Sequence, residues 1–264
     1  MFPLDTRWTL RGCPAALSLI VVGGLLIGRA VFAGEHTNAA LRVAVDIGHD
    51  AVRSGATSAR GKGEFLFNRR LALELVKRSK DHEAGKSLDL FVLNAGGEKL
   101  DLKERVRNAH DANADIFLSI HHDAVNERYL RSWSLDGSDY RYSDAFQGFS
   151  LFVSTENSKF EASVSLAKLI GQNLKDAGLI QTLHHAEPIA GENRVLLDWE
   201  YGIYDAPFAV LRHARIPSVL LEAGVIVNRA EETRLEDPAY RERIIGSILR
   251  ALESYRISSG ESRE

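Results

Sequence analysis

The chain has 264 residues, of which 45% are hydrophobic and 26% are charged. A chain of this size and composition buries an ordinary core without disulfides or partners, so one globular domain of α/β size is expected. The formal net charge is −3, and residues 1–33 hold three of the 33 basic residues but only one of the 36 acidic residues. The remainder is therefore acidic, which excludes the basic surface that nucleic-acid binding requires.

The N-terminal segment differs from the rest of the chain. Two arginines precede an uncharged stretch over residues 12–28 that contains "ALSLIVVGGLLIG", and "AVFAGE" then supplies small residues for cleavage. This order predicts a secretory signal peptide over residues 1–33 and a single domain over residues 34–264. The alternative is a retained membrane anchor, although the apolar run is slightly shorter than the ~20 residues of a spanning helix. Either reading places the domain outside the cytoplasm.

The only cysteine, Cys13, lies within the predicted signal peptide. The mature chain is therefore expected to hold no thiol and no disulfide. The same cleavage would leave it without a stable membrane span.

The rest of the chain alternates short apolar runs with helical patterns. The runs are rich in Val, Ile, Leu and Phe, as in strands of a sheet that is covered on both faces. Alternation of strand and helix predicts a three-layer α/β fold, with a mostly parallel sheet flanked by helices on both faces. In chain order we expect a strand over 41–47, a helix over 64–80, a strand over 88–94, a helix over 100–112, strands over 114–120 and 149–154, a helix over 161–177, a strand over 216–226 and a helix over 239–255.

The segment over residues 123–148 breaks this alternation. It carries aromatic and acidic residues with little periodicity, and it is too long for a plain connector. We expect a rim or a lid. Its aromatic side chains either stack on sugar rings or form a small core of the segment itself.

Polar residues stand where three of the predicted strands end, in "DIGHD", "SIHHDA" and "LLEAG". In parallel α/β sheets the ligand crevice lies beyond the carboxyl ends of the strands. His49, His121 and Glu64 supply two imidazoles and one carboxylate, the donors of a catalytic zinc, and Glu222 supplies a carboxylate that could take a proton from water. These residue types predict hydrolysis at a metal, and the alternative for each histidine is a polar cap at a strand end.

Three blocks of sequence resemble the zinc-dependent N-acetylmuramoyl-L-alanine amidases of the type 3 group. They are "VAVDIGHD…GA…GEFLFNRRLALELVKR", "LKERVRNAHDANADIFLSIHHDA" and "RIPSVLLEAGVIVNRAEE", and the resemblance covers about residues 41–250. It implies a zinc amidase domain in which Zn²⁺ is held by His49, Glu64 and His121, with Glu222 as general base. The departures are His122, where the family more often has Asn or a small residue, and Ala223-Gly224, where it often has Gly-Phe.

Strand alternation separates the two adjacent histidines of "SIHHDA". Phe117, Ser119 and His121 point to one face, whereas His122 points to the other, so both cannot easily reach one ion. The resemblance implies His121 as the ligand. His122 is then expected in the pocket wall or behind the ligands, in contact with substrate or with the ligands.

The segment "HHAEPIAGENR" concentrates charged residues and histidines in a loop composition that the minimal family pattern lacks. It could line the substrate groove through Glu192 and Arg194, or offer a carboxylate to the open metal position. The alternative is a solvated surface loop.

The resemblance implies a secreted, periplasmic cell-wall hydrolase that cleaves the amide between N-acetylmuramic acid and L-alanine of peptidoglycan. It also leaves room for a protein activator. Two alternatives stay open at this point. One is a related zinc amidohydrolase acting on N-acylated amino acids, and the other is a non-catalytic cell-wall binding protein.

Overall fold

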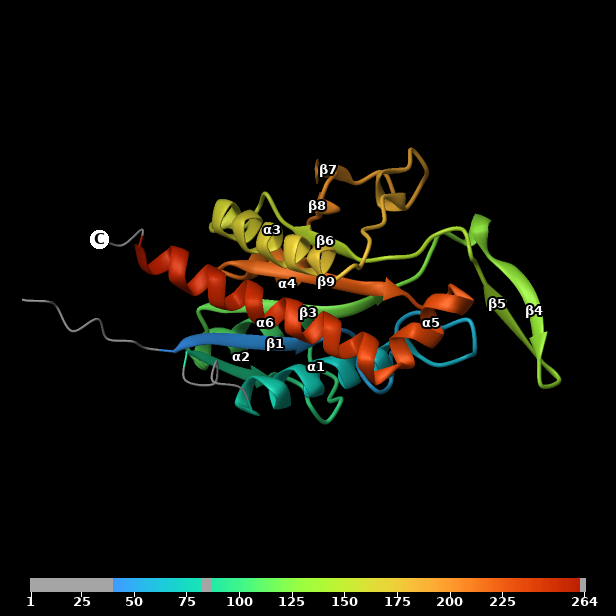
Figure 1. The fold of residues 1–264 in the computed structure, drawn as a ribbon, viewed down its shortest axis with the longest axis horizontal. Helices are drawn as coiled ribbons and strands as arrows, with labels where there is room; N and C mark the ends of the chain where they lie inside the picture. The colour runs from blue at the N-terminus through green and yellow to red at the C-terminus, as the bar shows by residue number, and fades with distance from the viewer. Residues whose placement is uncertain (1–39, 82–86, 262–264) are drawn as a thin grey trace, which may run out of the picture. The chain divides into compact units, whose positions relative to one another are not determined.

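The computed structural model describes residues 40–81 and 87–261 (Figure 1). The signal peptide predicted over residues 1–33 lies outside the described residues. Within the described ranges, no helix combines the length and the apolar character that crossing a membrane requires.

A seven-stranded sheet in the described part of the chain has the order β2-β1-β3-β9-β6-β8-β7. The first four of these strands pair in parallel, β6 runs antiparallel to β9 and parallel to β8, and β7 is antiparallel to β8. The predicted mostly parallel sheet is therefore confirmed. The strands are β1 Leu41–Ile47, β2 Leu88–Val92, β3 Ile116–Asp123, β6 Ser150–Val153, β7 Val195–Asp198, β8 Ile203–Asp205 and β9 Ser218–Val225.

Helices cover both faces of the sheet, which confirms the three-layer prediction. Side chains of α1, α3 and α6 form the larger core with one face, and those of α2 and α4 form a smaller core with the other. In Figure 1, α1, α3 and α6 lie in front of the sheet. The helices are α1 Glu64–Asp81, α2 Leu102–Asp111, α3 Phe160–Asp176, α4 Ala209–His213, α5 Arg229–Glu236 and α6 Pro238–Glu261.

The central strands are buried on both sides, and their side chains alternate between the two cores. In β3, Ile116, Leu118 and Ile120 belong to the larger core, whereas Phe117 belongs to the smaller one. Each such buried side chain contributes about 1.5–3 kcal/mol relative to an exposed one. This double burial explains why the strand sequences are continuous apolar runs.

The segment over residues 123–148 contains a β-hairpin of β4 Arg131–Leu135 and β5 Ser138–Tyr142. Its turn residues Asp136 and Gly137 both have positive φ, 53° and 79°, as in the tight hairpin turns that favour Asp-Gly. The hairpin projects beyond one end of the sheet (Figure 1). Trp133 packs 6.0 Å from Tyr142 between ring centroids and donates a hydrogen bond to the Ala59 carbonyl.

Several of the elements absent from the sequence prediction are short. β7, β8 and α4 have four, three and five residues, too few for periodicity to emerge above local composition. The Asp136-Gly137 pair is the sequence feature from which the β4–β5 hairpin could have been predicted.

A buried ion pair fixes the carboxyl end of β1. The Arg105 guanidinium of α2 donates to Asp46, at 2.9 Å, and to the carbonyl oxygens of Ile47 and His49. Ser119 donates to the other Asp46 oxygen at 2.7 Å, and the Asn94 side chain both accepts from and donates to the Ile47 backbone. Hydrogen bonds from Arg105 of α2 and from Asn94, which follows β2, therefore hold the backbone just before His49.

We expect Arg105→Ala to lower the free energy of unfolding by about 3–5 kcal/mol, because it leaves the Asp46 carboxylate buried without its cation. Chemical denaturation measures this. Arg107→Ala, an exposed arginine on the same helix, is the matched control and should change stability by no more than about 0.5 kcal/mol. Equal effects of the two substitutions would show that the buried pair does not anchor β1.

Candidate metal centre and catalytic cleft

Three segments bring metal-ligating side chains to one point at the carboxyl edge of the sheet. His49 follows β1, Glu64 opens α1 and His121 lies in β3, and their ligand atoms are all within 4.8 Å of one another. His49 Nε2 lies 2.9 Å from Glu64 Oε2, and His121 Nδ1 lies 3.0 Å from Glu64 Oε1. The structure therefore brings together the three residues that the resemblance implies as ligands.

Gly48 and Gly55 lie against this cluster, at positions where any larger residue would clash with it. A Cβ atom on Gly48 would lie 2.4 Å from the His121 ring, and one on Gly55 would lie 2.4 Å from Glu64 Oε2. Gly55 also has a φ of 75°, and His49 itself has a φ of 67°, a conformation that is uncommon for a residue with a side chain. Backbone strain of this kind costs of order 1–3 kcal/mol and is found preferentially at functional sites.

The Glu64 carboxylate is buried and heavily hydrogen-bonded. Besides the two histidines, it accepts from the backbone N–H of Ala56 at 3.1 Å, from Asn68 Nδ2 at 3.0 Å and from the backbone N–H of His122 at 3.3 Å. Burial by itself would raise the pKa of Glu64, but the hydrogen bonds from His121 and His49 outweigh it and hold the pKa far below its usual range. Glu64 is therefore ionised at any physiological pH.

His122 lies on the opposite face of β3 from His121, as strand alternation predicted. Its ring packs 5.6 Å from the Phe67 ring of α1, and its Nδ1 lies 2.8 Å from Asn68 Oδ1. The residue is only 3% exposed, and this burial lowers the pKa of His122 to about 3. A neutral His122 thus supports Glu64 through Asn68, from behind the cluster.

Glu222 stands opposite His121 in the parallel pairing of β3 and β9. Its Oε2 is buried and has no hydrogen-bond partner among the described residues. Burial, reinforced by the charges of Asp123 and Glu64, raises the pKa of Glu222 well above the usual value. A carboxyl group with unused hydrogen-bonding capacity and a raised pKa is suited to accept and return a proton.

A cavity of about 790 Å³ opens on this cluster. His49, His121 and Glu222 line it, and Phe208 and Val210, at the start of α4, contribute apolar lining. Further lining comes from the charged residues Asp46, Asp50, Arg53, Lys99, Asp101, Glu104 and Arg105, and from Leu100, Leu102, Ala209 and Leu220.

The residues predicted to bind substrate lie outside the lining of this cavity. His122 is buried behind the cluster, and Glu192 Oε2 is 2.8 Å from His185 Nδ1. The Arg194 guanidinium lies 5.0 Å from the ring centroid of Phe208, so it contacts a wall residue of the cavity. The loop over residues 184–194 packs against Asp123 and is not merely a solvated surface loop.

The sequence model of the N-acetylmuramoyl-L-alanine amidase family matches residues 43–254. The chain belongs to this family. It is 26% identical over 223 residues to the amidase AmiA of Escherichia coli (strain K12), covering 81% of this chain and 75% of that protein. It is 28% identical over 212 residues to the amidase LytC of Bacillus subtilis (strain 168), covering 80% of this chain and 34% of that protein.

Solved amidase structures share the fold. The catalytic domain of CwlV from Bacillus (Paenibacillus) polymyxa var. colistinus superposes with a TM-score of 0.61 at 26% identity, covering 81% of this chain and 97% of that one. An amidase from Clostridium difficile 630 gives a TM-score of 0.64 at 19% identity, covering 82% and 96%, which shows the fold alone. The predicted family and activity are confirmed. The protein is a peptidoglycan amidase that cleaves the bond between N-acetylmuramic acid and L-alanine.

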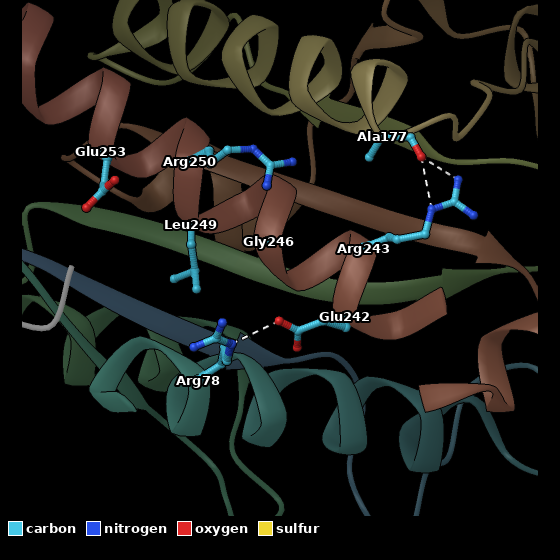
Figure 2. Close-up of a pocket in the computed structure, with 8 residues that line it drawn as sticks. All are labelled: Arg78, Ala177, Glu242, Arg243, Gly246, Leu249, Arg250 and Glu253. Atoms are coloured by element: carbon cyan, nitrogen blue, oxygen red, sulfur yellow. Dashed lines mark hydrogen bonds and ion pairs between the residues drawn. The ribbon is translucent and has the colours of Figure 1, made fainter. Parts of the chain in front are cut away.

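A second hollow of this amidase, of about 460 Å³, lies along α6 (Figure 2). Its charged walls are satisfied internally, because Arg78 pairs with Glu242 at 2.9 Å and Arg243 donates to the Ala177 carbonyl at 2.9 Å. Figure 2 shows both arginines turned toward these partners. This hollow shares no lining residue with the cavity at the histidines.

Metal retention should distinguish the two adjacent histidines of the amidase. His121→Ala removes a donor of the cluster and should lose one metal ion per chain together with activity. His122→Ala removes a ring behind the cluster and should keep the wild-type metal content, with a smaller change in activity. Metal analysis of both dialysed proteins measures this, and metal lost from the His122 variant but kept by the His121 variant would reverse the assignment.

Proposed function

We propose that the amidase is a zinc metallohydrolase, with Zn²⁺ held by His49, Glu64 and His121. The observation that carries the proposal is the convergence of these three donors, from three separate segments, beside the unpaired Oε2 of Glu222. Two imidazoles and one carboxylate are a donor set of catalytic zinc, with a further position left for water. A Zn²⁺ ion bound there would polarise the scissile carbonyl and lower the pKa of a coordinated water towards about 7.

The protein's own groups would perform the proton transfers. Glu222 takes the proton of the attacking water on Oε2 and returns it to the leaving amine of L-alanine. Its raised pKa suits this exchange, because an ordinary carboxylate would hold the proton too weakly to deliver it.

Supporting residues would keep the donors in place. The bonds from Arg105 and Asn94 to the end of β1 fix the backbone of His49, and Asn68 fixes the Glu64 carboxylate. Metal sites depend on such outer hydrogen bonds for ligand orientation and affinity. His122 belongs to this supporting set, since its burial keeps it from the substrate.

The cavity walls suggest how substrate is oriented. The apolar side chains of Phe208 and Val210 line the cavity together with the cationic side chains of Arg53 and Lys99. We propose that the cationic side chains bind carboxylates of the stem peptide, while the apolar wall contacts the peptide's aliphatic part. Arg194 would act through Phe208, on which its guanidinium lies.

The substrate lies outside the cytoplasm, and we propose export through residues 1–33 to the periplasm. Fractionation of cells that produce the full chain tests this, and retention of all activity in the cytosol would refute it.

A need for a protein activator stays a prediction. Comparing the muropeptide release of the purified amidase with that of cell extracts measures it.

Glu222→Gln should keep metal and fold while losing activity by ~10²- to 10⁴-fold, because the amide preserves shape but does not accept the proton. Release of stem peptides from isolated sacculi, followed by mass spectrometry, measures the loss. Glu242→Gln, an exposed residue of the hollow in Figure 2, is the control and should leave activity unchanged. Near-wild-type hydrolysis by metal-loaded Glu222→Gln would remove Glu222 as the general base.

A further inference from the structure

A second group of metal-ligating side chains lies next to the catalytic cleft. Asp123 ends β3, and His184 and His185 lie in the 3₁₀ turn His184–Ala186. One ligand atom from each residue lies within 4.8 Å of the others. The side chains are 8%, 1% and 10% exposed, respectively, so the group is buried.

The ring orientations of His184 and His185 suit metal binding. His184 Nδ1 lies 2.8 Å from Thr182 Oγ1, and His185 Nδ1 lies 2.8 Å from Glu192 Oε2. Both rings therefore have their outer nitrogen held by a hydrogen bond and turn Nε2 inward. Metal-ligating histidines almost always have this outer partner, which is commonly a carboxylate.

The inward nitrogens converge on one carboxylate oxygen. His184 Nε2 lies 3.3 Å and His185 Nε2 lies 2.8 Å from Asp123 Oδ2. Donors held about 2.0–2.1 Å from a tetrahedral zinc are about 3.3 Å apart. The distances from the two Nε2 atoms to Asp123 Oδ2 would therefore change little if an ion bound between them.

One nitrogen of the group is left unsatisfied. His184 Nε2 is buried and makes no hydrogen bond within the described part of the chain, although it is aimed at Asp123. A protonated His185 could bridge Asp123 and Glu192 without any metal, but it would still leave His184 Nε2 unpaired. A cation between the three donors satisfies all of them at once.

The surroundings of the group are apolar. The Phe146 ring stacks 4.9 Å from the His184 ring, and Phe152 meets the His185 ring edge-on at 5.0 Å, measured between centroids. An apolar shell of this kind limits water around a metal and strengthens its attraction to a carboxylate.

We propose that Asp123, His184 and His185 form a second zinc site, separate from the group of His49, Glu64 and His121. Imidazole and carboxylate donors suit Zn²⁺ among the common transition metals. The ion ties the turn at residues 184–186 to the end of β3.

Metal stoichiometry tests the proposal. The purified full chain, loaded with Zn²⁺ and dialysed, should hold two zinc ions. His184→Asn, His185→Asn and His121→Asn should each hold one, whereas the exposed His213→Asn control should hold two. Added Zn²⁺ should also raise the Tm of His121→Asn, but not that of His121→Asn combined with His184→Asn.

One zinc in the wild type, unchanged by His184→Asn, overturns the second site and leaves the catalytic site standing. Two ions retained by both His184→Asn and His185→Asn would place the second ion elsewhere and also overturn the proposal. Zinc kept by His121→Asn at the wild-type count contradicts the catalytic site instead. If either histidine variant fails to fold, the count in Asp123→Asn decides, with one ion expected and two overturning the site.

Discussion

The buried carboxylate of Glu64 is the interaction on which the catalytic end of the molecule depends. Its oxygens accept hydrogen bonds from the two cluster histidines, two backbone N–H groups and the Asn68 amide. A buried charge is tolerated only when it is paired and hydrogen-bonded in this way. Because the donors come from the loop after β1, the loop before α1, α1 itself and β3, satisfying one side chain also fixes four segments relative to one another.

Negative charge is concentrated around this carboxylate, and that concentration shapes the chemistry. Burial, reinforced by the charges of Asp123 and Glu64, raises the pKa of Glu222. Like charges in a low-dielectric site do not all ionise freely unless cations offset them. The same crowding of acids thus explains why the pKa of the Glu222 carboxyl group is raised.

The geometry of the site requires strained backbone conformations. His49 adopts a left-handed conformation. A Cβ atom on Gly48 would clash with the His121 ring, and one on Gly55 would clash with the Glu64 carboxylate. Strain of this size persists only where the surroundings over-determine the backbone. The Arg105 and Asn94 bonds to the end of β1 supply that determination, so Arg105 of α2, which also lines the cavity, helps to fix the backbone of His49.

The sequence by itself determined the three-layer fold, the family and the face on which each adjacent histidine lies. The family follows from the resemblance of three sequence blocks. The fold and the two faces follow from local periodicity, since apolar runs mark doubly buried strands and alternation of two separates His121 from His122. Tertiary structure alone decided what Asp123, His184 and Glu192 contact. Asp123 and His185 are 62 residues apart, and no local pattern encodes a meeting over that distance. Nor does a local pattern show that His122 is sealed behind α1, because burial depends on which helix packs over the strand.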